Sequence, residues 1–229
     1  MYHLPYRPRE LHYTRILSHF PWHRGNELLV EPLSARGIIL RPARIGKPGH
    51  KGCNVQYRRL LIDIKGRLLS DASCYCTTML DYYGLPSDFP GKSEIKTTMN
   101  SQMKSQVITK ALTNKIRADL GDAERRFLPY IQMHEFEGLL FSEPNTLASS
   151  LQQLHLISDF VKIREQAGNP EEINDSPQTA PSKRIEKLYN AYDKPVHPLL
   201  AARAIGLHTI RINCPVFDRW LTSIESLVS

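Results

Sequence analysis

The feature that most constrains the fold of this chain is an apolar run of residues that ends at a carboxylate. The stretch Cys74–Gly91, CYCTTMLDYYGLPSDFPG, begins with residues that favour a buried β-strand and changes character at Asp81. Two tyrosines and a loop rich in glycine and proline follow. A strand that ends in an acid and opens into such a loop is typical of a site at the carboxyl edge of a parallel sheet. The alternative, from these residues alone, is a strand, a helix cap and a turn without chemistry.

The residues before this strand predict a βαβ unit. Apolar positions at helical spacing predict a helix over 26–36, closed by a glycine, and a strand follows over 37–45. A second amphipathic helix is expected over 55–70, before the strand at 73–80. Because a βαβ crossover joins parallel strands, we expect an α/β fold with a central, mostly parallel sheet flanked by helices.

The rest of the chain is expected to be mainly helical. A long polar helix leads to residues 126–133, RFLPYIQM, which are predicted as the next strand. Helices are expected from about residue 143 onward, and Ser182 is predicted to cap one of them. The segment HTIRINCP fits either a short strand or a turn of helix. We therefore expect an atypical segment at 1–25 and a single domain at 26–229, with a helical portion over about 143–229.

Charge is distributed unevenly along the chain. Residues 1–70 hold 13 Lys and Arg against 4 Asp and Glu, a balance of +9, and the remainder has a balance of −2. A basic N-terminal third fits a polyanionic partner such as DNA or RNA, and a solvated basic face is the alternative. No apolar run approaches the ~18 residues that span a bilayer. Because the N-terminus also lacks the apolar region of a secretory signal, we expect a cytoplasmic protein with no membrane partner.

Acidic residues follow both predicted strands. Asp81 ends the first, and Glu135 and Glu137 follow the second. Because the carboxyl ends of parallel strands share one edge, these carboxylates are expected within reach of one divalent cation, which could activate water or stabilise charge on a phosphodiester. His134 is a candidate general base or phosphate contact. Its alternative role is a histidine satisfied by backbone at the strand end.

A second candidate feature is the basic sequence Ser182-Lys183-Arg184 at a predicted helix N-terminus, which suits a phosphate. A capped surface helix is the alternative. Lys194 and His197 are further candidates for the same groove.

Several other chemistries are unsupported. Gly138 stands where a zincin HExxH motif needs its second histidine, and the chain has no Walker A, GxGxxG or GxSxG motif. Cys74 and Cys76 are too close for a usual disulfide and too few for a zinc site, so buried thiols are expected.

Four segments, in order, resemble a known family. They are TTMLDYYGLPSDFPG, RFLPYIQMHEFEGLLF, NPEEINDSPQTAPSKRI and IRINCPVFDRWL, and they resemble the bacterial family catalogued as domain of unknown function 4276, over about residues 26–229. That family is regarded as Toprim-like and similar to the nuclease domain of the overcoming-lysogenization-defect proteins. Its members are often encoded beside AAA or ABC-type ATPases. The resemblance implies a Toprim-like (Rossmann-like) fold and a nuclease that acts with such an ATPase in defence against phage or foreign DNA.

The same resemblance implies residue roles. Asp81 takes the place of the Toprim aspartate, and Glu135 and Glu137 match the later acidic motif, around Mg²⁺ or Mn²⁺ for phosphodiester cleavage. Contact with substrate phosphates is assigned to residues in the family's other motif segments, namely His50, Lys51, Ser182, Lys183 and Arg184.

The chain departs from the Toprim pattern at its start. Toprim-like proteins begin with an apolar strand running into a form like VEGxTE, whereas this chain reads HYTRILSHFPWHRG before Asn26. Glu27 and Glu31 lie where the following helix belongs. We therefore expect either an altered start or a lost first strand, which would leave an open sheet edge, and in both cases a site short of one glutamate.

Three functions follow from these expectations. The first is a metal-dependent nuclease, and the second is a catalytically impaired subunit that binds nucleic acid or an ATPase. The third, a small-molecule hydrolase, rests only on the Tyr82–Tyr83 loop. The oligomeric state is left open, with a homo-oligomer as one option.

Overall fold

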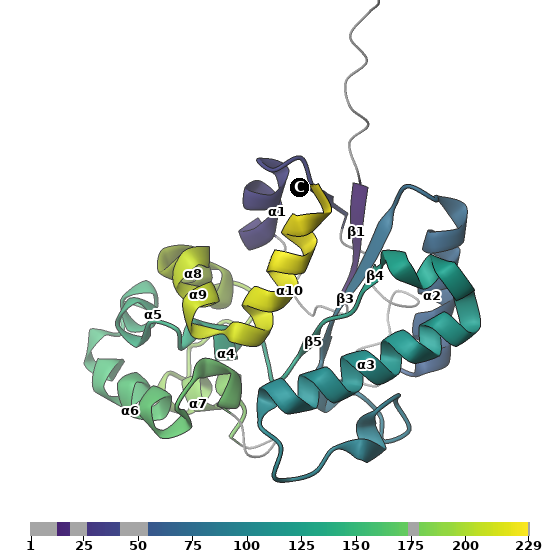
Figure 1. Cartoon of the computed structure of the whole chain (residues 1–229). Helices are drawn as coiled ribbons and strands as arrows, with labels where there is room; N and C mark the ends of the chain where they lie inside the picture. Colours follow the sequence, from purple (N-terminus) through teal and green to yellow (C-terminus); the bar gives the residue numbers. More distant parts are fainter. Residues whose placement is uncertain (1–12, 19–26, 42–54, 174–178, 229) are drawn as a thin grey trace, which may run out of the picture.

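A parallel sheet lies at the centre of the protein. The computed structural model describes residues 13–18, 27–41, 55–173 and 179–228. The strand order is β2-β1-β3-β4, with β5 also paired to β3, and every pairing is parallel (Figure 1). The strands are β1 (Tyr13–Ser18), β2 (Ile39–Leu40), β3 (Tyr75–Asp81), β4 (Phe127–Leu128) and β5 (Ile131–Gln132). The expected α/β class with a parallel sheet is therefore confirmed.

The strand β1 corrects the expectation of a lost first strand. It lies between β2 and β3, with Tyr13 opposite Ile39 and Ser18 opposite Met79. An extended backbone can satisfy the hydrogen bonds of both neighbours whatever its side chains are, so a sequence without the family's apolar pattern can still occupy this position. The sheet is continuous from β2 to β4.

The strand β3 is buried on both faces. Every residue from Cys76 to Leu80 is buried, as expected of a central strand in a parallel sheet. Leu80 belongs to the apolar cluster with the helices α2 (Tyr57–Ser70) and α3 (Ser101–Leu120), whereas Met79 belongs to the cluster with the C-terminal helices. Side chains alternate along a strand, so one strand can supply both cores.

Helices cover each face of the sheet. Helices α2 and α3 lie on one side, and α1 (Glu27–Ser34) and α10 (Pro215–Glu225) lie on the other (Figure 1). The predicted apolar stripes are buried, with Leu60, Ile64 and Leu68 on α2 and Ile108, Leu112 and Ile116 on α3. Gly37 follows α1 with a φ of 80°, which confirms the predicted glycine cap.

The C-terminal portion is helical, as predicted. Its remaining helices are α4 (Glu137–Leu140), α5 (Pro144–Ser150), α6 (Ile157–Ala167), α7 (Pro181–Leu188), α8 (His197–Ile205) and α9 (Leu207–Asn213). The segment that fitted either a strand or a helix is therefore the helix α9.

Two local predictions were wrong. The strand expected over 126–133 divides into β4 and β5, because Pro129 has no N–H to continue a ladder. Ala180, rather than Ser182, is the N-cap of α7, because Pro181 takes the first helical position. No described helix has the length and apolarity of a membrane span.

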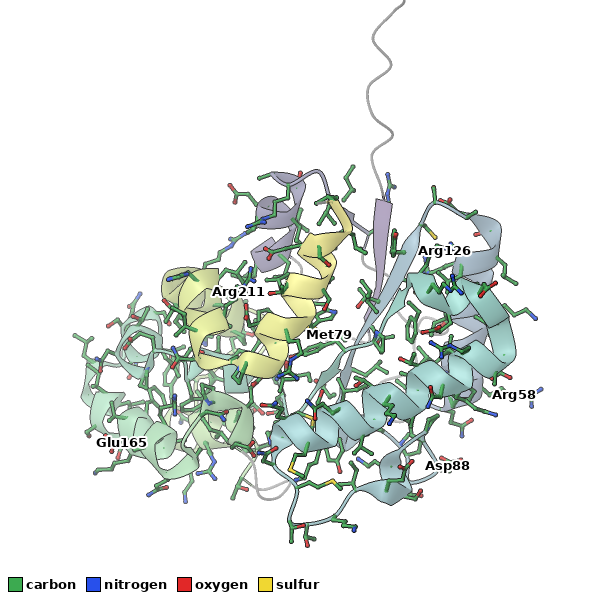
Figure 2. All side chains as sticks on the ribbon, viewed as in Figure 1. Arg58, Met79, Asp88, Arg126, Glu165 and Arg211 are labelled. Carbon is green, nitrogen blue, oxygen red and sulfur yellow. The ribbon has the colours of Figure 1, made fainter. Side chains whose placement is uncertain are left out.

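Arg126 connects three segments beside the sheet through hydrogen bonds. Its guanidinium donates to the backbone carbonyls of Leu68, Asp71 and Cys74 at 2.7–2.9 Å, which ties the end of α2 and the start of β3 to the entry of β4 (Figure 2). A planar fork of donors meets several carbonyls at once, which a single ammonium cannot do.

We predict that Arg126→Lys lowers the free energy of unfolding by about 2 kcal/mol, since charged hydrogen bonds to partly buried carbonyls are lost. Urea unfolding measures this value. The matched control is Arg125→Lys, whose exposed partner Asp122 should leave stability within about 0.5 kcal/mol. Equal effects of the two substitutions would contradict the role of Arg126.

Candidate functional site: an acid cluster at the carboxyl edge of the sheet

Three acidic side chains meet where β3 and β5 end. Asp81 is the last residue of β3, Glu135 lies in the turn after β5, and Glu137 begins α4. Their charges act on one another, since Glu135 raises the pKa of Asp81 and both of them raise the pKa of Glu137. The two strand ends therefore bring the predicted acids to one edge. We call Asp81, Glu135 and Glu137 the acid cluster.

Glu135 is the well-supported member of the cluster. Its Oε2 accepts the backbone N–H of Ser182 at 2.9 Å, and its Oε1 accepts Lys194 Nζ at 2.9 Å. Burial acts to raise the pKa of Glu135, but the hydrogen bonds from Ser182 and the charge of Lys194 outweigh it and hold that pKa below its ordinary value. Glu135 is therefore ionised at neutral pH.

No comparable hydrogen bonds from the described residues support Asp81 and Glu137. Glu137 is fully buried, and neither carboxylate oxygen has a hydrogen-bond partner among the described residues. Burial raises the pKa of Asp81 to about 8, with a further increase from the charge of Glu135. Burial likewise raises the pKa of Glu137 to about 8, against the opposing effect of Lys194. Both groups therefore hold a proton at neutral pH unless a cation compensates them.

Lys194 is the cation that the cluster does contain. Its Nζ lies 2.9 Å from Glu135 Oε1, 3.7 Å from Glu137 Oε1 and 3.2 Å from Ser182 Oγ. Burial acts to lower the pKa of Lys194, but Glu137 and Glu135 raise it above its ordinary value. Among the described residues, one ammonium thus faces three acids, so full ionisation of the cluster would leave two negative charges without a partner in that part of the chain.

Tyr192 is a member of the site that sequence reasoning missed. Its hydroxyl is buried with no hydrogen-bond partner among the described residues. Burial raises its pKa, and the charges of Glu137 and Glu135 raise it further, which locates the ring beside the acid cluster. The signal available in the sequence was its position two residues before Lys194, a residue that was already a groove candidate.

A divalent cation fits part of this donor set. Unpartnered oxygens on a buried carboxylate call for either a proton or a cation, and Mg²⁺ binds through one or two carboxylates while keeping several waters. Asp81 and Glu137 are the acids whose oxygens are available, because Glu135 is engaged by Ser182 and Lys194. Within the described part of the chain, no three His, Cys, Asp or Glu side chains are already grouped as a metal site.

The other predicted site residues are dispersed. Ser182 is buried and holds Glu135 in place, whereas the exposed Lys183 pairs with Glu186 at 2.6 Å and Arg184 donates to the Thr179 carbonyl at 2.7 Å. Successive helical residues point in different directions, and these three side chains have separate partners. His134 is buried beside Glu135. His50 and Lys51 lie outside the described residues.

Comparison with known proteins agrees with the sequence segments quoted above. A family model described as Domain of unknown function (DUF4276) matches residues 25–225. No protein with a curated description and no solved structure matches the chain.

Protonation of the cluster should govern stability. Glu137 has a folded-state pKa raised to about 8, above its ordinary value of 4.5, so ionisation favours the unfolded chain. Its stabilising contribution is complete below about pH 4.5 and is lost as the pH rises through about 8, at no more than about 1.4 kcal/mol per pH unit. We predict that Glu137→Gln makes the free energy of unfolding decrease less as the pH rises. The variant should therefore be more stable than the wild type at about pH 8.

Urea unfolding across the same pH range measures the effect. Glu165→Gln, at an exposed position on α6, is the control and should follow the wild-type profile. A parallel pH profile for Glu137→Gln and wild type would contradict the raised pKa.

Loss of the ammonium should have the opposite effect. We predict that Lys194→Met destabilises the fold by about 2 kcal/mol at neutral pH, because Glu135 loses its charged partner. The loss should be smaller at about pH 4 than at neutral pH, because Glu135 without the charge of Lys194 takes up a proton more readily as the pH falls. The exposed Lys187→Met is the control, and equal losses at both pH values would contradict the ion pair.

Proposed function

We propose that this chain, which belongs to the family described as domain of unknown function DUF4276, is a metal-dependent nuclease that hydrolyses phosphodiesters at the acid cluster. The observation that carries the proposal is the lack of hydrogen-bond donors and cations, among the described residues, around two acids at the sheet edge. Asp81 and Glu137 each have a pKa raised to about 8, and one ammonium serves three acids. Carboxyl groups that lack a charged partner in this way can bind a divalent cation. Carboxyl pKa values raised this far are typical of functional sites.

In this proposal Asp81 and Glu137 hold the cation, Mg²⁺ or Mn²⁺. When bound, such a cation supplies Lewis acidity toward a phosphoryl oxygen and lowers the pKa of a coordinated water. Glu135 keeps Lys194 in place through the 2.9 Å ion pair, and the buried N–H of Ser182 fixes Glu135. The Lys194 side chain is about a third exposed, and its ammonium is the group proposed to approach a phosphate oxygen.

The remaining parts of the proposal come from the family resemblance alone. They are the ATPase partner and a role in defence against phage or foreign DNA.

One observation favours a second function. Residues 18–26, between the end of β1 and the start of α1, contain no Asp or Glu, so the strand beside β3 is followed by no carboxylate. A chain with an incomplete site would act as a catalytically impaired subunit that binds nucleic acid or an ATPase. That function predicts binding that weakens steeply with salt and needs no metal.

Cleavage assays test the first function. We predict that the wild type cuts DNA or RNA in Mn²⁺ or Mg²⁺, and that Asp81→Asn and Glu135→Gln each lower the rate by at least about a hundredfold. Asp88→Asn is the matched control, because Asp88 is an exposed acid on the loop that follows Asp81 (Figure 2). It should leave the rate unchanged.

A metal-binding measurement separates the two functions. Calorimetric titration with Mn²⁺ at about pH 7 should release protons, because Asp81 and Glu137 are protonated without the cation. Glu137→Gln should release fewer protons. Wild-type protein that binds no Mn²⁺ and cuts no DNA or RNA, with its ATPase present, would overturn the nuclease and leave the binding subunit.

A further inference from the structure

A cleft of about 490 Å³ opens between α3 and α10, where Leu128, Pro129 and Tyr130 connect β4 to β5. Figure 1 shows the two helices on either side of these strands. Polar residues of α3 spaced along two turns form one wall, and residues 216–223 of α10 form the other. None of the lining residues belongs to the acid cluster.

The chemistry of the walls favours an anion. Lys110 on α3 and Arg219 on α10 face the cleft from opposite walls, and both are exposed. Four hydroxyl and two amide side chains accompany them, whereas no carboxylate occurs among the described residues that line the cleft. The neighbouring Asp218 is held in an ion pair with Arg211. Cations, hydroxyls and amides are the groups with which proteins contact phosphates.

The floor of the cleft is preformed. Tyr130 and Trp220 stack with ring centroids 4.5 Å apart, and Trp220 Nε1 donates to Thr77 Oγ1 at 2.8 Å. Both rings are almost wholly buried, so they support the floor instead of offering a face for stacking. Pro129, also on the floor, has no N–H, which disfavours an added peptide strand at this edge. The side chains of the walls are therefore the groups that can contact a ligand in the cleft.

Hydrogen bonds connect the floor with the acid cluster. The Tyr130 hydroxyl donates to Gln132 Oε1 at 2.6 Å, and Gln132 Nε2 donates to the backbone carbonyl of Glu135 at 3.3 Å. The cleft borders Leu128, Pro129 and Tyr130, and the chain then enters β5, which Glu135 follows. Tyr130 therefore belongs both to the cleft and to the hydrogen-bonded path that ends at Glu135.

We propose that the α3–α10 cleft binds the phosphodiester backbone of single-stranded nucleic acid. Positively charged grooves that follow the backbone are typical of single-strand binding. The cleft volume is in the lower part of the range for small-ligand sites and suits one or two nucleotides, not a duplex. Delivery of the strand for cleavage rests on the proposed nuclease, whereas binding itself requires no metal.

Fluorescence anisotropy with a labelled oligonucleotide of about 16 nucleotides, in EDTA, tests this site. Lys110→Gln combined with Arg219→Gln should weaken single-strand binding about tenfold at about 50 mM salt. The slope of log K against log salt should flatten by about 1.4, which corresponds to two lost phosphate contacts. The control combines Lys65→Gln with Lys162→Gln, which removes the same charge from α2 and α6.

The outcomes separate this site from the nuclease. Three results would each overturn the proposed binding site in the cleft. They are equal weakening by the two double variants, no binding by the wild type, and a preference for duplex over single strand. Single-strand binding in EDTA that the Lys110→Gln, Arg219→Gln variant weakens, with no cleavage by the wild type in Mn²⁺ and its ATPase present, would support the cleft and overturn the nuclease. Unchanged melting temperatures in both double variants would show that the effect is not unfolding.

Discussion

Lys194 reaches Glu135 and Glu137 from the segment between α7 and α8, and its single positive charge faces three acids. The low polarity around the cluster makes that imbalance energetically important, because a buried carboxylate without donors or a counterion strongly favours its protonated form. Helix α7 supplies the Ser182 N–H to Glu135, and the segment that follows α7 supplies Tyr192. The C-terminal helices thus complete a site that the sheet begins.

The sheet can hold an acid in this environment because β3 is fixed from both sides. Its apolar residues enter two cores, and its threonines donate to the backbone of the edge segment, as Thr78 Oγ1 does to the Tyr130 carbonyl at 3.2 Å. The central position of β1 adds a parallel partner along most of the length of β3. Asp81 therefore ends a strand with little freedom to move, although burial of its charge works against stability. Natural sites commonly retain such locally unfavourable groups where function needs them.

The acid cluster and the α3–α10 cleft share one structural support. Tyr130 lines the cleft, and its hydroxyl begins the hydrogen-bonded path through Gln132 to the Glu135 carbonyl. If both proposals hold, this chain combines a groove for the nucleic-acid backbone with an acidic edge. Such a combination would suit a protein that binds phosphodiesters, because the basic side chains of the groove can contact phosphates that the acid cluster would repel.

The sequence by itself determined most of the secondary structure and the location of the acids. Helical periodicity was sufficient for α1, α2 and α3, because their buried positions recur on one face. The common edge of Asp81 and Glu135 also followed, since parallel strands end on the same side of a sheet. The amino-acid composition did not predict β1. Backbone hydrogen bonds define that strand, and they leave no pattern in the side chains.

Only the tertiary structure decided what surrounds the acids. Lys194 lies 59 positions from Glu135 along the chain, and no local pattern links the two. Ser182 matched the composition of a phosphate site, yet Pro181 moved it into the helix and turned its N–H toward Glu135. The pKa values near 8 and the walls of the cleft likewise arise from segments that meet only on folding. Sequence spacing constrains neighbours on one element, whereas burial and charge depend on every element that packs against it.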